Sequence, residues 1–257
     1  MYRSIAVALL LCVGGCTGFG LGPPSPEATK AMSKAKTVGV ISAVGHKFAL
    51  QKMGITVFGN ELNEVPIDSW GIDNAVASRI SALLSKRFTV KRIGVPQGAF
   101  ASYESPGGAF RDSDADLQGI VRKLAAPQNC DLVIVVIRAG IPFGSSNQTV
   151  VGLGMIEAGG ALNPDNVHLY AVMTILVYDG RTFERLHWHR VGLEIGASLV
   201  GKVINAPYRT LDRTWWPATP QAVHSEKLKA ATRALVEQGL ATGLPEVMGM
   251  TKQAKAE

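Results

Sequence analysis

The sequence predicts a single α+β domain, a mixed β-sheet with helices packed on it, after a cleaved signal and a flexible tether. In the first half of the chain, segments with the apolar period of helices alternate with β-branched runs, which is typical of covered parallel crossovers. In the second half, β-branched runs follow one another with short turns between them, which indicates antiparallel strands. A hydrophobic content of 47% with 18% charged residues fits an ordered core.

The first ordered elements are two strands and a helix. The runs at residues 37–44 and 48–58 are β-branched and close together, and the turn at Gly45 between them predicts a β-hairpin. Residues 71–86 are expected to form a helix, because their apolar side chains recur every three or four positions. A strand over roughly residues 88–94 completes the first α-then-β step.

The middle of the chain repeats that step. Residues 96–111 are rich in Gly, Ser and Pro and are expected to form a long loop. A second helix is expected over about residues 113–125, since Pro127 stops it. Residues 131–139 then form a nearly continuous β-branched run, which is typical of a strand covered on both faces.

The second half is expected to hold antiparallel strands and one helix. Residues 149–158 and 167–178 each have the composition of a strand. The Asp-Gly dipeptide that follows predicts a tight hairpin into a strand over residues 182–195. A final helix is expected over about residues 221–240, with an apolar stripe facing the sheet.

Residues 1–16 have the order of a secretory signal peptide: one basic residue, nine apolar residues and small residues up to a cysteine. Nine apolar residues are too few to cross a hydrocarbon core about 30 Å thick. The motif Val13-Gly14-Gly15-Cys16 resembles the lipobox of bacterial lipoproteins. The resemblance implies diacylglyceryl transfer to the Cys16 thiol, cleavage before Cys16, and acylation of the new amino terminus with a fatty acid such as palmitate.

Four segments follow from this resemblance and from composition. They are a lipoprotein signal peptide at 1–15, a lipidated flexible tether at 16–35, a globular domain at 36–245 and a polar tail at 246–257. We therefore expect the mature protein to be exported and anchored to a bacterial membrane by its lipid alone. It would face the periplasm, most simply from the outer membrane of the cell envelope.

The expected element order, ββαβα followed by several strands and a helix, is similar to that of three kinds of bacterial envelope lipoprotein. These are the curli-secretion lipoprotein, the penicillin-binding-protein activators and the amino-terminal domain of the Tol–Pal translocation protein. The resemblance covers roughly residues 37–240 in element order only, so it assigns no functional residue. The resemblance to the curli-secretion lipoprotein allows a ring- or pore-forming homo-oligomer. A non-catalytic binding or assembly role with an envelope protein or polymer is expected from the lipid anchor, the compact α+β pattern and the missing catalytic constellation.

The charge of the chain is modestly positive. The net charge of +6 falls to +5 when Arg3 leaves with the signal. This excess would attract anionic lipid headgroups or glycan phosphates, or it solubilises the surface in general. The Lys and Arg residues are dispersed along the sequence without a basic helix, so no nucleic-acid partner is expected.

The cysteine content is reduced to one by processing. Cys12 leaves with the signal and Cys16 carries lipid, so Cys130 stands alone in an oxidising compartment and cannot form an intrachain disulfide. Because it lies at the start of a buried strand, we expect a small packed residue rather than a nucleophile.

Two histidines are the weak metal candidates in the sequence. His187 and His189 are two apart on a predicted strand, so both side chains would leave the same face, with Arg185 beside them. A stable site needs three or four ligands, and the Arg185 charge opposes a cation. We therefore expect a solvent-facing polar stripe, no metal and no cofactor.

A run of three aspartates resembles the opening of a calcium loop. Asp112, Asp114 and Asp116 have the required spacing, but Leu117 stands where the loop needs glycine and Lys123 where it needs a carboxylate. Acidic residues are expected in a first helical turn, so these aspartates are predicted to cap the helix.

Trp215 and Trp216 are the candidate binding surface. Two adjacent tryptophans beside a proline would form a contact surface for a partner or a membrane, or they fold onto the sheet as core. The leading hypothesis is therefore a non-catalytic lipid-anchored binding protein. The alternative is a lipid-anchored envelope hydrolase with a site assembled from residues such as His187, His189 and Asp179.

Overall fold

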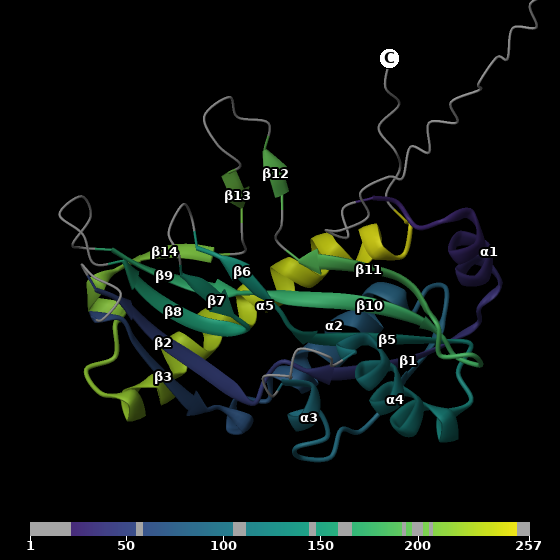
Figure 1. Ribbon diagram of the computed structural model, residues 1–257, viewed down its shortest axis with the longest axis horizontal. Coiled ribbons are helices and arrows are strands. Elements are labelled where there is room, and N and C mark those ends of the chain that lie inside the picture. The colour runs from purple at the N-terminus through teal and green to yellow at the C-terminus, as the bar shows by residue number, and fades with distance from the viewer. Residues whose placement is uncertain are drawn as a thin grey trace, which may run out of the picture.

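The computed structural model describes residues 22–54, 59–104, 112–143, 148–158, 166–191, 194–196, 203–205 and 208–250. The signal peptide and Cys16 lie outside these residues. As predicted, the chain forms a single α+β domain with mixed sheets and helices packed on them (Figure 1). Its strands form two five-stranded sheets, which we call sheet A and sheet B, and two small two-stranded ribbons.

Sheet A combines a parallel and an antiparallel half. In spatial order it contains β11 (Arg185–Val191), β10 (Met173–Asp179), β5 (Leu132–Arg138), β1 (Thr37–Ala43) and β4 (Thr89–Arg92). The strands β5, β1 and β4 run parallel, as the alternation of helices and strands predicted, and β10 and β11 form the predicted antiparallel hairpin. The tight turn predicted at Asp179-Gly180 is wrong, because Asp179 N donates to Glu184 O at 3.0 Å and four residues form the turn between them. Strand β5 is buried at its first six positions, as expected for a strand covered on both faces.

Sheet B is mostly antiparallel and lies at the other end of the molecule (Figure 1). In spatial order it contains β14 (Tyr208–Asp212), β9 (Asn166–Ala171), β8 (Leu153–Ala158), β2 (Lys47–Met53) and β3 (Glu61–Pro66). The two ribbons pair β6 (Gly140–Pro142) with β7 (Thr149–Val151) and β12 (Glu194–Gly196) with β13 (Val203–Asn205).

The predicted hairpin of residues 37–44 and 48–58 is wrong. Strand β1 pairs with β4 and β5, whereas β2 pairs with β3 and β8 in the other sheet. Both strands are largely buried, so each needs partners on both sides, and the chain passes from one sheet to the next between Ala43 and Lys47. A short turn between two apolar runs indicates two strands but does not say which strands they pair with.

Two other predicted strands are each divided at the junction of the sheets. Residues 149–158 break at Gly152, whose φ is 66°, and residues 167–178 break at Val172. Three backbone hydrogen bonds close a ring there: Ala139 N donates to Val172 O, Val172 N to Gly152 O, and Gly152 N to Ala139 O, at 2.7–3.1 Å. The ring joins three chain segments where each of them changes sheet.

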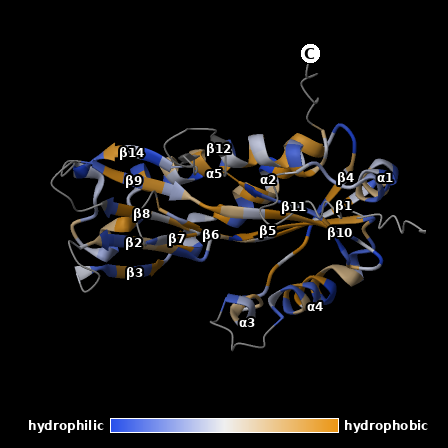
Figure 2. Cartoon of the chain, turned by 45° about the horizontal axis from the view of Figure 1, so that its top comes forward, coloured by the Kyte–Doolittle hydropathy of each residue, from blue (hydrophilic) through white to orange (hydrophobic). Residues whose placement is uncertain are grey.

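Helices cover both faces of sheet A. Helices α2 (Ile72–Leu84) and α5 (Glu226–Val247) pack on one face, and α4 (Ser113–Ala125) packs on the other. Figure 2 shows the apolar strands of sheet A as the hydrophobic layer between them. The first two predicted helices are confirmed, whereas α5 ends later than predicted and includes the start of the expected polar tail. A short helix, α3 (Ala101–Glu104), lies within the expected loop.

The expected flexible tether is wrong for its second half. Residues Pro26–Lys34 form helix α1, whose Ala28 and Met32 side chains are each 2% exposed. Ser25 caps the helix by accepting a hydrogen bond from Ala28 N, and proline occupies the first helical position. The Gly-, Pro- and Ser-rich composition obscured these helix-start signals. The folded domain therefore begins before residue 36.

In the described part of the chain, 3₁₀ turns also form at Asp68–Trp70, Ala126–Gln128, Arg213–Trp215 and Pro220–His224. Among the described residues, no helix is both long and apolar enough to cross a bilayer.

Candidate functional site

A groove of about 1100 Å³ opens at the carboxyl ends of β1 and β4, where the chain leaves sheet A. Three segments line most of it: residues 42–47 after β1, residues 71–74 at the start of α2, and residues 92–104 after β4. The parallel strands have the order β4-β1-β5, so β1 has β4 on one side and β5, the next strand of the sheet along the chain, on the other. In open α/β sheets, ligands bind outside the carboxyl ends of such strands.

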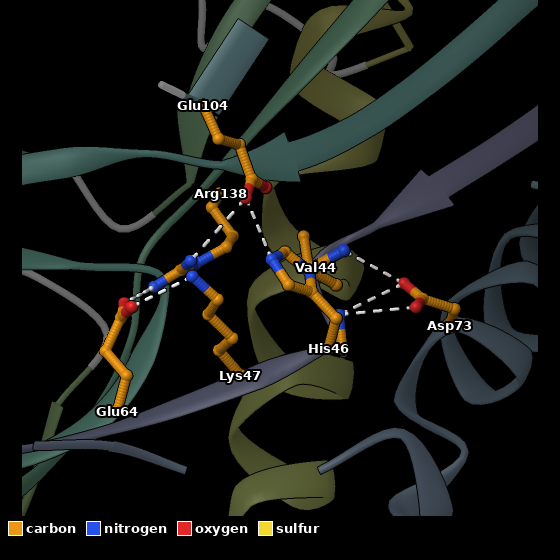
Figure 3. A network of polar contacts seen from close by, with 8 residues as sticks. Val44, His46, Lys47, Glu64, Asp73, Glu104 and Arg138 are labelled. Atoms are coloured by element: carbon orange, nitrogen blue, oxygen red, sulfur yellow. Dashed lines mark hydrogen bonds and ion pairs between the residues drawn. The ribbon is translucent and has the colours of Figure 1, made fainter. Parts of the chain in front are cut away.

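Asp73 in the first turn of α2 lines the groove and binds the chain between β1 and β2 (Figure 3). Its Oδ1 accepts the Ser42 hydroxyl at 2.6 Å and the backbone N–H of Val44 at 2.9 Å, and Gly45 N donates at 3.2 Å. The backbone N–H groups of Val44 and Gly45 lie between β1 and β2, and the Asp73 carboxylate accepts their hydrogen bonds in place of a neighbouring strand. It also occupies the positive end of α2, so the groove is not an anion cradle.

An ion-pair chain of five residues runs along one side of the groove (Figure 3). His46 Nε2 lies 2.9 Å from Glu104 Oε2, and Arg138 Nη1 lies 3.9 Å from the same oxygen. Arg138 Nη2 lies 2.9 Å from Glu64 Oε1, whose carboxylate also binds Lys47 Nζ at 3.0 Å. The chain therefore ties α3, β2, β3 and the end of β5 together.

Arg138 is the buried centre of this chain, with 8% of its side chain exposed. Gly152 leaves room for it: a Cβ there would collide with Arg138 Nε, and the positive φ also favours glycine. Burial by itself would raise the pKa of Glu64, but hydrogen bonds from Arg138 and Lys47 outweigh it and hold the pKa below its usual value. The Glu64 carboxylate is therefore ionised in the folded state at neutral pH.

The groove offers both apolar and charged surface. Ile93 and Phe100 contribute buried apolar side chains, and the ion-pair chain contributes the charges. Among the described residues that line the groove, Ser42 provides the one hydroxyl side chain. Ser42 is 6% exposed, and its hydroxyl donates a hydrogen bond to the Asp73 carboxylate. A serine nucleophile is usually activated by an imidazole instead.

The two candidate histidines lie elsewhere, under α5. His189 is 8% exposed and its Nε2 lies 3.0 Å from Glu246 Oε2, so the expected solvent-facing stripe is wrong. His187 is half-buried, and burial, followed by the nearby His189, lowers its pKa. Within the described ranges, no group of three His, Cys, Asp or Glu side chains has an arrangement that could hold a metal ion.

Arg185 does not share a face with these histidines, contrary to expectation. The pairing of β10 with β11 shifts register between Val177 and Tyr178, which is a β-bulge. The shift turns Arg185 to the opposite face, where its Nη1 lies 2.9 Å from Asp114 Oδ1 on α4. The spacing of residues in a strand predicts a shared face only while the strand has no bulge.

Trp215 and Trp216 are half-buried and lie outside the groove. Both rings pack against the main hydrophobic core. Lys227 Nζ lies 3.8 Å from the centre of the Trp215 ring, and Lys52 Nζ lies 6.0 Å from that of Trp216. The rings thus combine core packing with a partly exposed edge, and their role in binding a partner stays a prediction.

The remaining candidates have structural environments. Cys130 is free and 5% exposed, and burial raises the pKa of its thiol, as expected for a packed residue. Asp112 caps α4 by accepting hydrogen bonds from Asp114 N and Ala115 N, each at 3.0 Å, which confirms the capping prediction. Cys16 lies outside the described residues.

Sequence reasoning missed the groove residues. His46, Glu64, Glu104 and Arg138 come from segments far apart in the chain, and no motif links them. One signal was available: Arg138 ends a run of six apolar residues. A charged side chain at the end of a buried strand needs an ionic partner, so its neighbourhood was the place to look for a polar site.

No family model and no curated protein matches the chain. Among solved structures it is similar to a DUF330 protein from Xanthomonas campestris, at 8% identity and a TM-score of 0.35 over 84% of this chain and 85% of that one. Lipoprotein GNA1162 from Neisseria meningitidis gives 12% identity and a TM-score of 0.27 over 81% and 99%. The LpoB C-terminal domain from Salmonella enterica gives 11% and 0.21 over 63% and 92%. Likeness at these TM-scores assigns neither family nor activity.

Proposed function

We propose that this chain is an exported bacterial envelope lipoprotein, anchored by acyl chains on Cys16, whose groove binds an envelope protein or polymer without catalysing a reaction. The signal peptide and the motif Val13-Gly14-Gly15-Cys16 support the anchor. The outer membrane, with the domain in the periplasm, is the location we propose.

The observation that carries the binding role is the way the groove holds its charges. Four elements contribute to the ion-pair chain, so its carboxylates and cations are positioned before a partner arrives. Fixed polar groups cost a ligand less conformational entropy than mobile ones, which favours affinity. The mixture of apolar and charged lining suits an extended segment of a protein or polymer.

The alternative of a hydrolase using His187, His189 and Asp179 has no supporting contact. His189 faces Glu246 under α5, and Asp179 Oδ1 accepts the backbone N–H of Arg181 at 2.8 Å. The groove lies elsewhere, and none of the three proposed catalytic residues lines it.

The anchor is tested by mass spectrometry of the mature amino terminus. We expect a chain that starts at Cys16 and carries acyl groups, and we expect Cys16→Ser to leave an unprocessed, unlipidated precursor. A hydroxyl is a much poorer nucleophile than a thiolate, so serine does not substitute for the acceptor. A free Cys16 thiol in the mature protein would end the proposal.

Binding in the groove is tested by filling it. Ala101→Trp places a large ring at the exposed rim of the groove, and Ala230→Trp places the same ring on the exposed face of α5 as the matched control. In cross-linked pull-downs from native envelopes with the lipidated protein, we expect Ala101→Trp to lower partner capture at least tenfold and Ala230→Trp to leave it unchanged. Equal capture by both variants would remove the groove from the proposal. Hydrolytic activity that His187→Ala abolishes would replace the proposal with the hydrolase alternative.

A further inference from the structure

The place where the described chain begins limits where a lipid on Cys16 can lie. Pro24 packs against the C-terminal end of α5, where a Cβ added to Gly249 would lie 3.1 Å from Pro24 Cγ. The backbone of Gly22 lies beside the His187 side chain. Six peptide units join Cys16 to Gly22 and reach at most about 22 Å. The acyl chains must therefore enter a bilayer close to this end of the domain.

Basic side chains gather at the same end. We call it the basic end and define it by six exposed cations at or near the starts of the strands of sheet A: Lys30, Lys34, Lys36, Lys86, Arg87 and Arg181. Four carboxylates accompany them: Glu27, Asp131, Asp179 and Glu184. Cations that are dispersed along the sequence thus become concentrated by the fold.

Specific contacts bring these segments side by side. Arg87 Nη2 donates to Met32 O in α1 at 3.3 Å, and Thr89 N donates to Lys36 O at 2.8 Å. Gly180 N donates to Asp131 O at 2.8 Å, next to the start of β1. Figures 1 and 2 both place α1 at the end of sheet A that lies away from sheet B.

The basic residues of α1 point away from the core. Lys30 lies two residues from both Ala28 and Met32, which puts it on the opposite side of the helix, and Lys34 follows one turn later. The helix dipole accounts for cations near helix C-termini, such as Lys34. It does not account for Lys30, in the middle of α1.

The groove lies at the other end of the same strands. Strand β1 begins at the basic end and ends at the groove, and its seven residues span about 20 Å. The groove is lined by four carboxylates, on Glu64, Asp68, Asp73 and Glu104, and by two cations, Lys47 and Arg92. The two ends of β1 therefore differ in charge as well as in shape.

We infer that the basic end rests on a lipid bilayer surface with anionic headgroups and that the groove faces away from that bilayer. The inference rests on the proposed lipidation of Cys16 and adds the lipid class and the orientation. Each Lys or Arg near an anionic surface favours association by roughly fivefold, and the basic end carries six of them. A partner then reaches the groove without competing with the membrane.

Headgroup quenching of a fluorophore tests the orientation on the lipidated full chain. Ser33→Cys on the exposed side of α1 reports on the basic end without removing a cation, and Gln97→Cys reports on the groove rim. The buried Cys130 leaves the new thiol as the accessible one among the described residues. In vesicles containing about 30% phosphatidylglycerol and a headgroup-linked quencher, we expect at least threefold stronger quenching at residue 33 than at residue 97. Equal quenching, or stronger quenching at residue 97, would overturn the orientation.

Charge variants test the lipid class. In the Ser33→Cys background, Lys34→Glu is expected to lower quenching at least twofold, whereas Arg209→Glu, an exposed cation on β14, should leave it unchanged. Quenching at residue 33 should also fall in 0.5 M salt, because salt screens exposed charges. It should fall as well in phosphatidylcholine vesicles, whose headgroups carry no net charge. Insensitivity to salt, headgroup and Lys34→Glu would overturn the electrostatic contact.

Mass spectrometry of each sample separates the two proposals. Acylated protein with equal quenching at both positions keeps the anchor and removes the orientation. Protein without acyl groups would contradict the proposed lipid anchor. Sedimentation of that protein with the same vesicles would then test, without the anchor, whether the basic end binds anionic lipid. Binding to anionic but not neutral vesicles supports the basic surface, and binding to neither overturns it.

Discussion

Strand β1 is held by a carboxylate at each of its ends, and the two carboxylates have different surroundings. At the start, Asp131 Oδ2 accepts the N–H of Lys36 and Thr37, each at 2.9 Å, and the Thr37 hydroxyl at 3.0 Å. At the end, Asp73 accepts the Ser42 hydroxyl and the N–H of Val44 and Gly45. The hydrogen-bonding pattern is nearly the same.

The difference between the ends is burial. Ser42 is 6% exposed and Val44 is fully buried, whereas Lys36 is exposed and Thr37 is half-buried. Water can replace Asp131 at the start of the strand but cannot easily replace Asp73 at its end. One end is thus an open, basic surface suited to a solvated partner such as lipid headgroups. The other is a fixed site whose polar groups satisfy one another.

The largest expected effect comes from removing the two carboxylates in turn. Asp73→Ala should lower the free energy of unfolding by about 3 kcal/mol, because it leaves buried donors without an acceptor. Asp131→Ala should cost about 1 kcal/mol, since water reaches its donors. Urea unfolding measures both values. Equal costs would remove the contrast between the two ends of β1.

The next effect compares two arginine ion pairs. Arg138→Met at the groove should cost about 2 kcal/mol, because it leaves Glu64 and Glu104 beside an apolar side chain. Arg185→Met should cost less than about 0.5 kcal/mol, since the Arg185–Asp114 pair is exposed. Chemical denaturation of both variants checks the difference. A larger loss for Arg185→Met would show that Arg138 does not organise the groove.

Trp215 lies away from both ends of β1, so its substitution gives a stability change with which the others can be compared. Because its ring is half-buried against the core, Trp215→Ala should cost about 1.5 kcal/mol, less than the full cost of truncating a buried tryptophan. Thermal unfolding measures this cost. An unchanged melting temperature, together with lost partner capture by the Trp215→Ala and Trp216→Ala double variant, would instead support a binding surface. A loss above about 4 kcal/mol would make Trp215 a core residue.

The smallest effect concerns acid stability at the basic end. Hydrogen bonds from the backbone of Lys36 and Thr37 lower the pKa of Asp131 below its ordinary value of 3.8. A carboxyl with a lowered folded-state pKa stabilises the fold above its unfolded pKa and loses that contribution as the pH falls through the folded value. Asp131→Asn should therefore be slightly less stable than the unsubstituted protein at pH 7, and the gap should shrink as the pH falls below the ordinary value of 3.8. A gap of the same size at pH 2 as at pH 7 would contradict this role.

The sequence predicts the helix-covered half of the fold better than the junction. Residues 113–125 were predicted as a helix and form α4, because period, cap and stop signal agree. Residues 37–58 contain two strands as predicted, but their partners are the distant segments around Val90, Leu132 and Leu153. Apolar pattern gives the existence of a strand, while pairing depends on tertiary contacts.

The groove could not be predicted in the same way. Asp73 has the sequence context of an ordinary residue in the first turn of a helix, and its contacts with Ser42 and Val44 arise from the fold. Glu104 lies in a segment expected to be a loop, yet it meets His46 from 58 residues away. Polar residues that gain their role from long-range pairing leave no local pattern.

The most direct test of the anchored arrangement is the intact mass of the mature protein purified from bacterial membranes. The expected mass is that of residues 16–257 with a diacylglyceryl group and an additional acyl chain on Cys16. A mature chain that begins at another residue, or that begins at Cys16 without acyl groups, would contradict the anchor and the membrane-facing basic end built on it.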